Sequence, residues 1–127
     1  MSTDMTPIRI LAVDDHPMFR QGLAALLATQ PDMSLIAEAS NGREAVQQFR
    51  AHHPDITLMD LQMRDMNGLD AMVAIRGEFP EASIIILTTY PGDVQGAMKV
   101  GARAYLLKSQ LHKELLGTIR SVHCGKQ

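Results

Sequence analysis

The sequence has few aromatic residues, a single cysteine and no excess of positive charge, and each of these shortages disfavours a class of protein. Aromatic residues make up 4% of the 127 residues and tryptophan is absent, so we expect an aliphatic core in which methionines fill gaps. The single cysteine, Cys124, cannot form an internal disulfide bond. We also find no secretion signal and no long apolar run, so we expect a cytoplasmic protein without membrane contact. Twelve Lys and Arg against 14 Asp and Glu disfavour DNA binding by this chain.

Short apolar segments alternate with amphipathic segments along the chain. We predict strands over residues 8–13, 33–39, 56–59, 83–87 and 104–107, with helices between them, a weak helix over 93–100 and a last helix over 110–123. This alternation predicts an α/β fold with a parallel sheet covered by helices on both faces. Functional groups of such a sheet gather at the carboxyl ends of the strands. The length is typical of a single domain, which we place over residues 1–127 with a flexible N-terminus at 1–7.

Polar residues directly follow four of the five predicted strands, and these are Asp14 and Asp15, Asp60, Thr88 and Thr89, and Lys108. Three carboxylates at one sheet edge repel one another unless a cation is shared or a pKa rises. Hard oxygen ligands of this kind favour Mg²⁺. Phosphoryl transfer needs an oxygen nucleophile, a metal ion and a lysine, and Asp60, alone at its strand end, is the predicted nucleophile. We expect an aspartyl phosphate that then attracts the Thr88 hydroxyl.

Four motifs occur in order, at residues 14–17 (DDHP), 59–63 (MDLQM) with 66–68 (MNG), 87–90 (LTTY) and 101–108 (GARAYLLK). Together they resemble the receiver domain of bacterial two-component response regulators, and the resemblance covers nearly the whole chain. The sequence is most similar to the NarL/FixJ (LuxR-type) regulators, because of its DDHP and LTTY motifs and residues 119–123. The resemblance implies a flavodoxin-like sheet with the strand order 2-1-3-4-5.

The resemblance also implies a role for each strand-end residue. A sensor histidine kinase would phosphorylate Asp60, with Mg²⁺ bound by Asp15, Asp60, the backbone carbonyl of Gln62 and, largely through water, Asp14. Thr88 and Tyr105 would relay the change to the surface of the fourth helix and fifth strand, and Lys108 would pair with the phosphoryl oxygens. Thr89 would tune access to the phosphoryl group.

The resemblance further implies a C-terminal helix-turn-helix domain, which this sequence lacks. Residues 124–127 would then begin the linker to that domain. Phosphorylation would control transcription through that domain, and it could also promote a homodimer. The chain itself would be a regulatory phosphoacceptor that assists its own phosphorylation and dephosphorylation, and not an enzyme acting on a separate substrate.

The sequence departs from the family pattern at two places. Arg64 stands where a proline is usual, which puts the dynamics and charge of the loop after Asp60 in doubt. Lys108 follows Thr88 by 20 residues, about two fewer than the family pattern, and two residues turn a helix by roughly 200°. Gly92, Gly96 and Gly101 also lower helix propensity. We therefore predict that the fourth helix is short, displaced or partly melted.

Other interpretations remain open from the sequence. A Mg²⁺-dependent phosphatase of the haloacid-dehalogenase kind also uses an aspartate nucleophile, but its D-x-D signature is missing here. A flavodoxin-like cofactor binder would need a phosphate-binding loop after the first strand, and a degenerate receiver would act only as a docking module. Each candidate residue also has a purely structural interpretation. Asp14 and Asp15 could cap the first helix, and Thr88, Tyr105 and Lys108 could be ordinary surface or turn residues. We interpret all five histidines as structural or solvated, because no spacing among them indicates a zinc site.

Overall fold

The computed structural model describes residues 6–63 and 65–125, which contain a five-stranded parallel sheet in the order β2-β1-β3-β4-β5. The strands are β1 (Ile8–Val13), β2 (Met33–Ala39), β3 (Ile56–Asp60), β4 (Ile84–Thr88) and β5 (Ala104–Leu107). The helices are α1 (Pro17–Ala28), α2 (Gly42–His52), α3 (Gly68–Glu78), α4 (Val94–Lys99) and α5 (Leu111–His123). The predicted fold class and strand order are confirmed.

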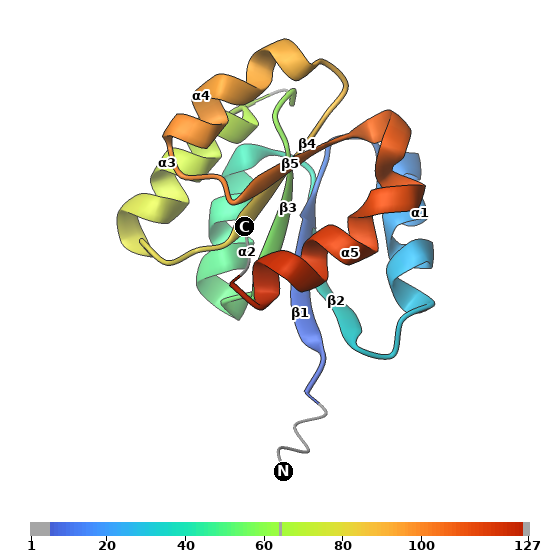
Figure 1. Ribbon diagram of the computed structural model, residues 1–127. Coiled ribbons are helices and arrows are strands. Elements are labelled where there is room, and N and C mark those ends of the chain that lie inside the picture. Colours follow the sequence, from blue (N-terminus) through green and yellow to red (C-terminus); the bar gives the residue numbers. More distant parts are fainter. Residues whose placement is uncertain (1–5, 64, 126–127) are drawn as a thin grey trace.

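The sheet is covered on both faces, with α1 and α5 on one side and α2, α3 and α4 on the other (Figure 1). Successive strand residues point to opposite faces, so one strand supplies two cores. In β4, Ile84 and Ile86 pack into the core beneath α2 and α3, whereas Ile85 and Leu87 pack into the core beneath α1 and α5. This two-sided burial explains why the central strands β1, β3 and β4 are mostly apolar and end at polar residues, whereas the edge strands β2 and β5 are only partly buried.

Helix starts lie at the same sheet edge as the polar strand ends. Asn41 caps α2 by accepting a hydrogen bond from the Glu44 backbone N–H at 2.8 Å, and Asn67 caps α3 through the Asp70 N–H at 2.9 Å. Helix α1 instead begins with Pro17, and its N-cap residue, His16, makes no side-chain capping bond. Asp14 and Asp15 precede the cap, so neither is the N-cap residue.

Helix α4 is only six residues long and follows a 3-10 turn at Pro91–Asp93. The prediction of a short fourth helix is therefore confirmed. Val94 and Ala97 form its buried side. Gly101 then ends this segment with a φ of 110°, a backbone conformation that favours glycine.

Some expectations differ from the structure or fall outside its described part. The helical spacing of Leu69, Met72 and Val73 in the sequence predicts that all three lie on the apolar side of the third helix, but Val73 is 53% exposed, whereas Ala71, Met72 and Ile75 are buried. Most of the expected flexible N-terminus (residues 1–5), half of the expected linker (residues 126–127) and Arg64 lie outside the described residues.

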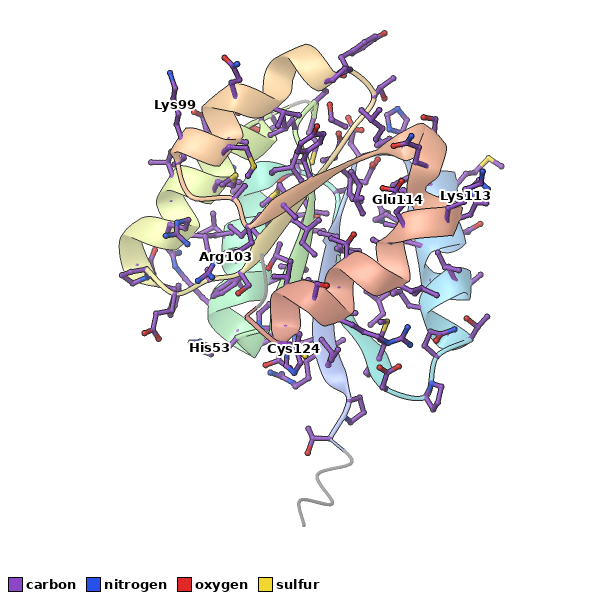
Figure 2. All side chains as sticks on the ribbon, in the orientation of Figure 1. His53, Lys99, Arg103, Lys113, Glu114 and Cys124 are labelled. Atoms are coloured by element: carbon purple, nitrogen blue, oxygen red, sulfur yellow. The ribbon has the colours of Figure 1, made fainter. Side chains whose placement is uncertain are left out.

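The described helices include none long and apolar enough to cross a membrane. Cys124 is exposed at the end of α5 (Figure 2).

Candidate functional site

A buried ion pair connects the strand ends. Asp14 follows β1 and is fully buried, Asp60 ends β3 with 2% of its surface exposed, and Lys108 follows β5. The Lys108 ammonium lies 2.7 Å from Asp14 Oδ2 and 3.5 Å from Asp60 Oδ2. The lysine therefore supplies one positive charge to two buried carboxylates, which leaves a net negative pocket at the edge predicted from the sequence.

The Asp60 carboxyl is held in an unfavourable environment for its charge. Burial and the nearby Asp14 carboxylate raise the pKa of Asp60 to about 6, although Lys108 and the Gln62 backbone N–H act in the opposite direction. Asp60 Oδ1 accepts a hydrogen bond from that N–H at 3.2 Å. Asp60 Oδ2 is buried without a hydrogen-bond partner among the described residues. A carboxylate oxygen with an unused lone pair is thus directed into the pocket.

His16 lies at the mouth of the same pocket. Its Nδ1 atom is 3.0 Å from Asp14 Oδ1 and 3.0 Å from Asp15 Oδ1. Its backbone N–H also donates to Asp14 Oδ1 at 2.8 Å. The interpretation of His16 as only structural or solvated is therefore incomplete. Its position directly after Asp14 and Asp15 is the sequence feature that could have indicated this contact.

The predicted relay residues lie on β4, on β5 and in the loop after β4. The Thr88 hydroxyl donates to the Tyr90 carbonyl at 3.1 Å and accepts from the Tyr90 N–H at 3.2 Å, so it is engaged in its own turn. Thr89 is exposed, and Tyr105 on β5 is 45% exposed. Within the described residues, none of the three makes a hydrogen bond or ion pair with Asp60, and their switching roles remain predictions.

Close packing and backbone hydrogen bonds hold the loop between Asp60 and α3 against the rest of the fold. A Cβ at Gly68 would overlap the Asp60 carbonyl oxygen, and the Gly68 N–H donates to the Leu61 carbonyl at 3.1 Å, so α3 begins directly against the strand end. The Gly42 N–H of α2 donates to the Met66 carbonyl at 2.9 Å. This close packing gives a physical reason for the glycine of the MNG motif.

The donor set fits a hard divalent cation. Asp14, Asp15, His16 and Asp60 each offer one ligand atom, and these atoms all lie within 4.8 Å of one another. Three of the four are carboxylates, which are suited to Mg²⁺, and the buried Asp60 Oδ2 has no competing hydrogen bond in the described structure. The residues present therefore fit the predicted ion, whereas the Gln62 carbonyl as a ligand remains a prediction.

Two further residues support the pocket and were not identified from the sequence. The Lys108 ammonium lies 4.3 Å from the centroid of the Phe19 ring and makes a cation–π contact with it. Arg20 donates to the Asp14 backbone carbonyl and pairs with Glu38 at 3.1 Å. Both residues come from α1, and their spacing on an amphipathic helix gave no indication of a contact with the strand ends.

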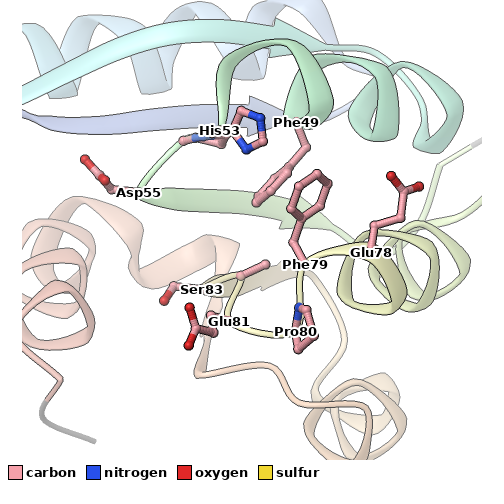
Figure 3. A pocket seen from close by; sticks show the side chains of 10 residues that line it. Phe49, His53, Asp55, Glu78, Phe79, Pro80, Glu81 and Ser83 are labelled. Atoms are coloured by element: carbon pink, nitrogen blue, oxygen red, sulfur yellow. The ribbon is translucent and has the colours of Figure 1, made fainter.

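A second hollow of about 660 Å³ lies at the opposite edge of the sheet (Figure 3). Its wall includes an aromatic cluster in which the Phe79 ring centroid lies 5.0 Å from that of Phe49 and 5.1 Å from that of His53. Glu78 at its rim is paired with Arg50. None of the predicted site residues lines this hollow, so it is separate from the acidic pocket.

Comparison with known proteins identifies the family. Residues 10–120 match the response regulator receiver domain. The chain belongs to this family. The NarL/FixJ assignment is supported by a two-component response regulator of the LuxR family from Aurantimonas sp. SI85-9A1, which superposes with a TM-score of 0.91 at 33% identity, covering 96% of this chain and 89% of that one.

Curated relatives are regulatory proteins that are longer than this chain. The chain is 42% identical over 121 residues to the transcriptional regulatory protein LiaR of Bacillus subtilis, covering 94% of this chain and 57% of LiaR. It is 35% identical over 121 residues to the response regulator protein VraR of Staphylococcus aureus, covering 94% of this chain and 58% of VraR. The receiver chain thus spans little more than half the length of these relatives.

Proposed function

We propose that Asp60 accepts a phosphoryl group from the phosphohistidine of a sensor histidine kinase. An Asp60 carboxylate oxygen forms the new bond to phosphorus as the bond from phosphorus to the histidine nitrogen breaks, and the imidazole leaves with the electron pair. The single observation that carries this proposal is the buried Asp60 Oδ2 atom, which lacks a hydrogen bond within the described residues and faces the Lys108 ammonium.

Asp14, Asp15, Asp60 and the Gln62 carbonyl would hold Mg²⁺, and the bound ion would neutralise charge on the phosphoryl oxygens and on the acidic pocket. Lys108 offers the second positive charge. It would exchange its 2.7 Å contact with Asp14 for one with the phosphoryl group, because the aspartyl phosphate carries more negative charge than the carboxylate.

Thr88 would carry the signal away from the pocket. To reach a phosphoryl oxygen, its hydroxyl must leave the Tyr90 backbone, which frees the turn before α4. Tyr105 is half exposed on β5 and would change rotamer as this surface rearranges, while the exposed Thr89 would set access to the phosphoryl group.

The chain, residues 1–127, would then act as a single receiver domain in the cytoplasm. It would be a regulatory phosphoacceptor that assists its own phosphorylation and dephosphorylation. Its switched surface would control a helix-turn-helix output domain and thereby transcription, with homodimerisation as a second consequence of phosphorylation. Its formal net charge of −2 supports an output that does not include DNA binding by this chain alone.

The test uses acetyl phosphate as the phosphoryl donor and Mg²⁺ as the metal. We expect one phosphoryl adduct by intact mass in the natural sequence and in Asp70→Asn, whose carboxylate is exposed on α3, and none in Asp60→Asn or without metal. Amide NMR shifts should spread from Asp60 to Thr88, Tyr105 and α4. An adduct that persists in Asp60→Asn would overturn the proposal. Absence of any adduct or Mg²⁺-dependent shift would favour a docking module instead.

A further inference from the structure

The His16 side chain forms a local hydrogen bond with Asp14 through Nδ1 and also lies close to Asp15. His16 is the N-cap residue of α1, yet its side chain makes no capping hydrogen bond, and 69% of that side chain is exposed. Its Nδ1 atom nevertheless lies 3.0 Å from an oxygen of Asp14 and 3.0 Å from an oxygen of Asp15. The ring thus points into the acidic pocket from the solvent side, while Asp14 and Asp60 approach it from the sheet.

The 3.0 Å spacing is that of the hydrogen bond between His16 and Asp14, and it also equals the spacing of neighbouring ligands around one ion. Two adjacent ligands in an octahedral shell with bonds of about 2.1 Å lie roughly 3.0 Å apart. Both distances from His16 Nδ1 have this value, and all four candidate ligand atoms lie within 4.8 Å of one another. An ion bound by the carboxylates would therefore lie within reach of the imidazole nitrogen without a large movement of the ring.

We propose that His16 Nδ1 is a further ligand of the cation in the acidic pocket and that it shifts the selectivity of the pocket toward borderline transition ions such as Co²⁺. The inference rests on the proposed cation site and goes beyond it by adding a nitrogen ligand. Imidazole strengthens the binding of Co²⁺, Ni²⁺ and Zn²⁺ much more than that of Mg²⁺, which prefers oxygen. The ligand set of three carboxylates and one imidazole is therefore mixed in character.

The experiment compares Co²⁺ and Mg²⁺ binding by the full chain without an affinity tag, each measured by calorimetry with the chloride salt and no phosphoryl donor. We expect His16→Ala to lower Co²⁺ affinity about tenfold and Mg²⁺ affinity less than about threefold. His16→Asn should give the same result, and asparagine is favoured at an N-cap, so this variant retains the start of α1.

A spectroscopic signature separates ligation from a merely electrostatic effect of the ring. An imidazole bound to Co²⁺ through Nδ1 carries an exchangeable Nε2–H proton with a large paramagnetic shift in the ¹H NMR spectrum. We expect this resonance in the natural sequence and its loss in both His16 variants. Unchanged Co²⁺ affinity, or a resonance that persists in His16→Ala, would overturn the inference.

Two control variants test whether Co²⁺ binds instead to Cys124 and His123. Cys124 is an exposed thiol next to the exposed His123 at the end of α5, and this pair could bind Co²⁺ by itself. We expect Cys124→Ser and His123→Ala to retain both the affinity and the shifted resonance. If these variants lose the signal and His16→Ala retains it, the inference is wrong.

The outcome is independent of the proposed phosphorylation, because metal binding is measured without a donor. An adduct on Asp60 with Mg²⁺, together with a ratio of Co²⁺ to Mg²⁺ affinity that His16→Ala leaves unchanged, would overturn only the role of His16. A His16-dependent preference for Co²⁺ in a protein that forms no adduct would instead overturn the proposed phosphoacceptor function.

Discussion

Asp60 combines a buried position at the end of β3 with a pKa raised to about 6. In the unfolded chain a carboxyl of this kind titrates near its ordinary value of about 3.9. The folded protein therefore binds the proton more tightly than the unfolded chain does. The ionised Asp60 consequently destabilises the fold, and this cost increases as the pH rises from about 4 to about 6.

We predict that Asp60→Asn stabilises the metal-free protein at pH 7.5. The expected gain in the free energy of unfolding is about 2 kcal/mol, because the amide removes a buried charge next to Asp14. The gain should nearly vanish at pH 4, where Asp60 is protonated in the folded state. Urea denaturation with EDTA at the two pH values measures this difference. An equal gain at both pH values would contradict the burial of the Asp60 charge as its cause. The control is Glu81→Gln, which removes an exposed carboxylate at the opposite sheet edge and should not change the stability in this pH-dependent way.

At the scale of elements, α4 is the shortest α-helix of the described structure. Its six residues follow a 3-10 turn, with Gly96 inside the helix and Gly101 in the turn between the helix and β5. These two glycines differ in their surroundings. A Cβ at Gly96 would make only an ordinary contact at 3.8 Å with Leu69, whereas one at Gly101 would lie 2.5 Å from Arg76 Nε.

This difference predicts opposite effects of the same substitution. Gly96→Ala should stabilise the protein by about 0.5–1 kcal/mol, since alanine favours the helix and the site has room for a methyl group. Gly101→Ala should destabilise it by at least about 1 kcal/mol, because φ is 110° there and Arg76 must move. Urea denaturation gives both values, and amide exchange over residues 94–99 should slow only in Gly96→Ala. Equal signs for the two variants would refute this account of α4.

At the scale of the whole molecule, the acidic pocket exists only when β1 and β3 lie side by side. Asp15 and Asp60 are far apart along the chain, and the pairing of Val13 with Met59 brings the two strand ends to one edge. A cation that needs both residues therefore binds the folded state and not the unfolded chain. Binding of this kind adds to the free energy of unfolding in proportion to the logarithm of ligand concentration.

We predict that Mg²⁺ at a hundred times its dissociation constant raises the free energy of unfolding by about 2.7 kcal/mol. EDTA should reverse the effect, and Asp15→Asn should abolish most of it because one carboxylate ligand is lost. Glu81→Gln should retain it in full. Thermal or urea unfolding measures each case. A stabilisation by Mg²⁺ that survives in Asp15→Asn would place the ion elsewhere.

Much of the fold follows from local patterns in the sequence. Apolar runs that end at Asp14, Asp60 and Thr88 identify buried strands, because only a strand covered on both faces is continuously apolar. The asparagines before α2 and α3 identify helix starts, and the short spacing before Lys108 correctly predicted a short α4. These features depend on neighbouring residues, so their physical causes are present in the sequence itself.

The charge state and contacts of the pocket depend on residues that are distant in the chain. The pairing of Lys108 with Asp14, the raised pKa of Asp60 and the approach of His16 to both aspartates arise only when the ends of three strands, β1, β3 and β5, meet in a buried space. Thr88 illustrates the same limit, since the motif cannot show that its hydroxyl binds the Tyr90 backbone. The pattern of apolar and polar residues identifies which side chains lie at the sheet edge. Their charge state and contacts are set by burial and by the distances between charges, which only the folded structure fixes.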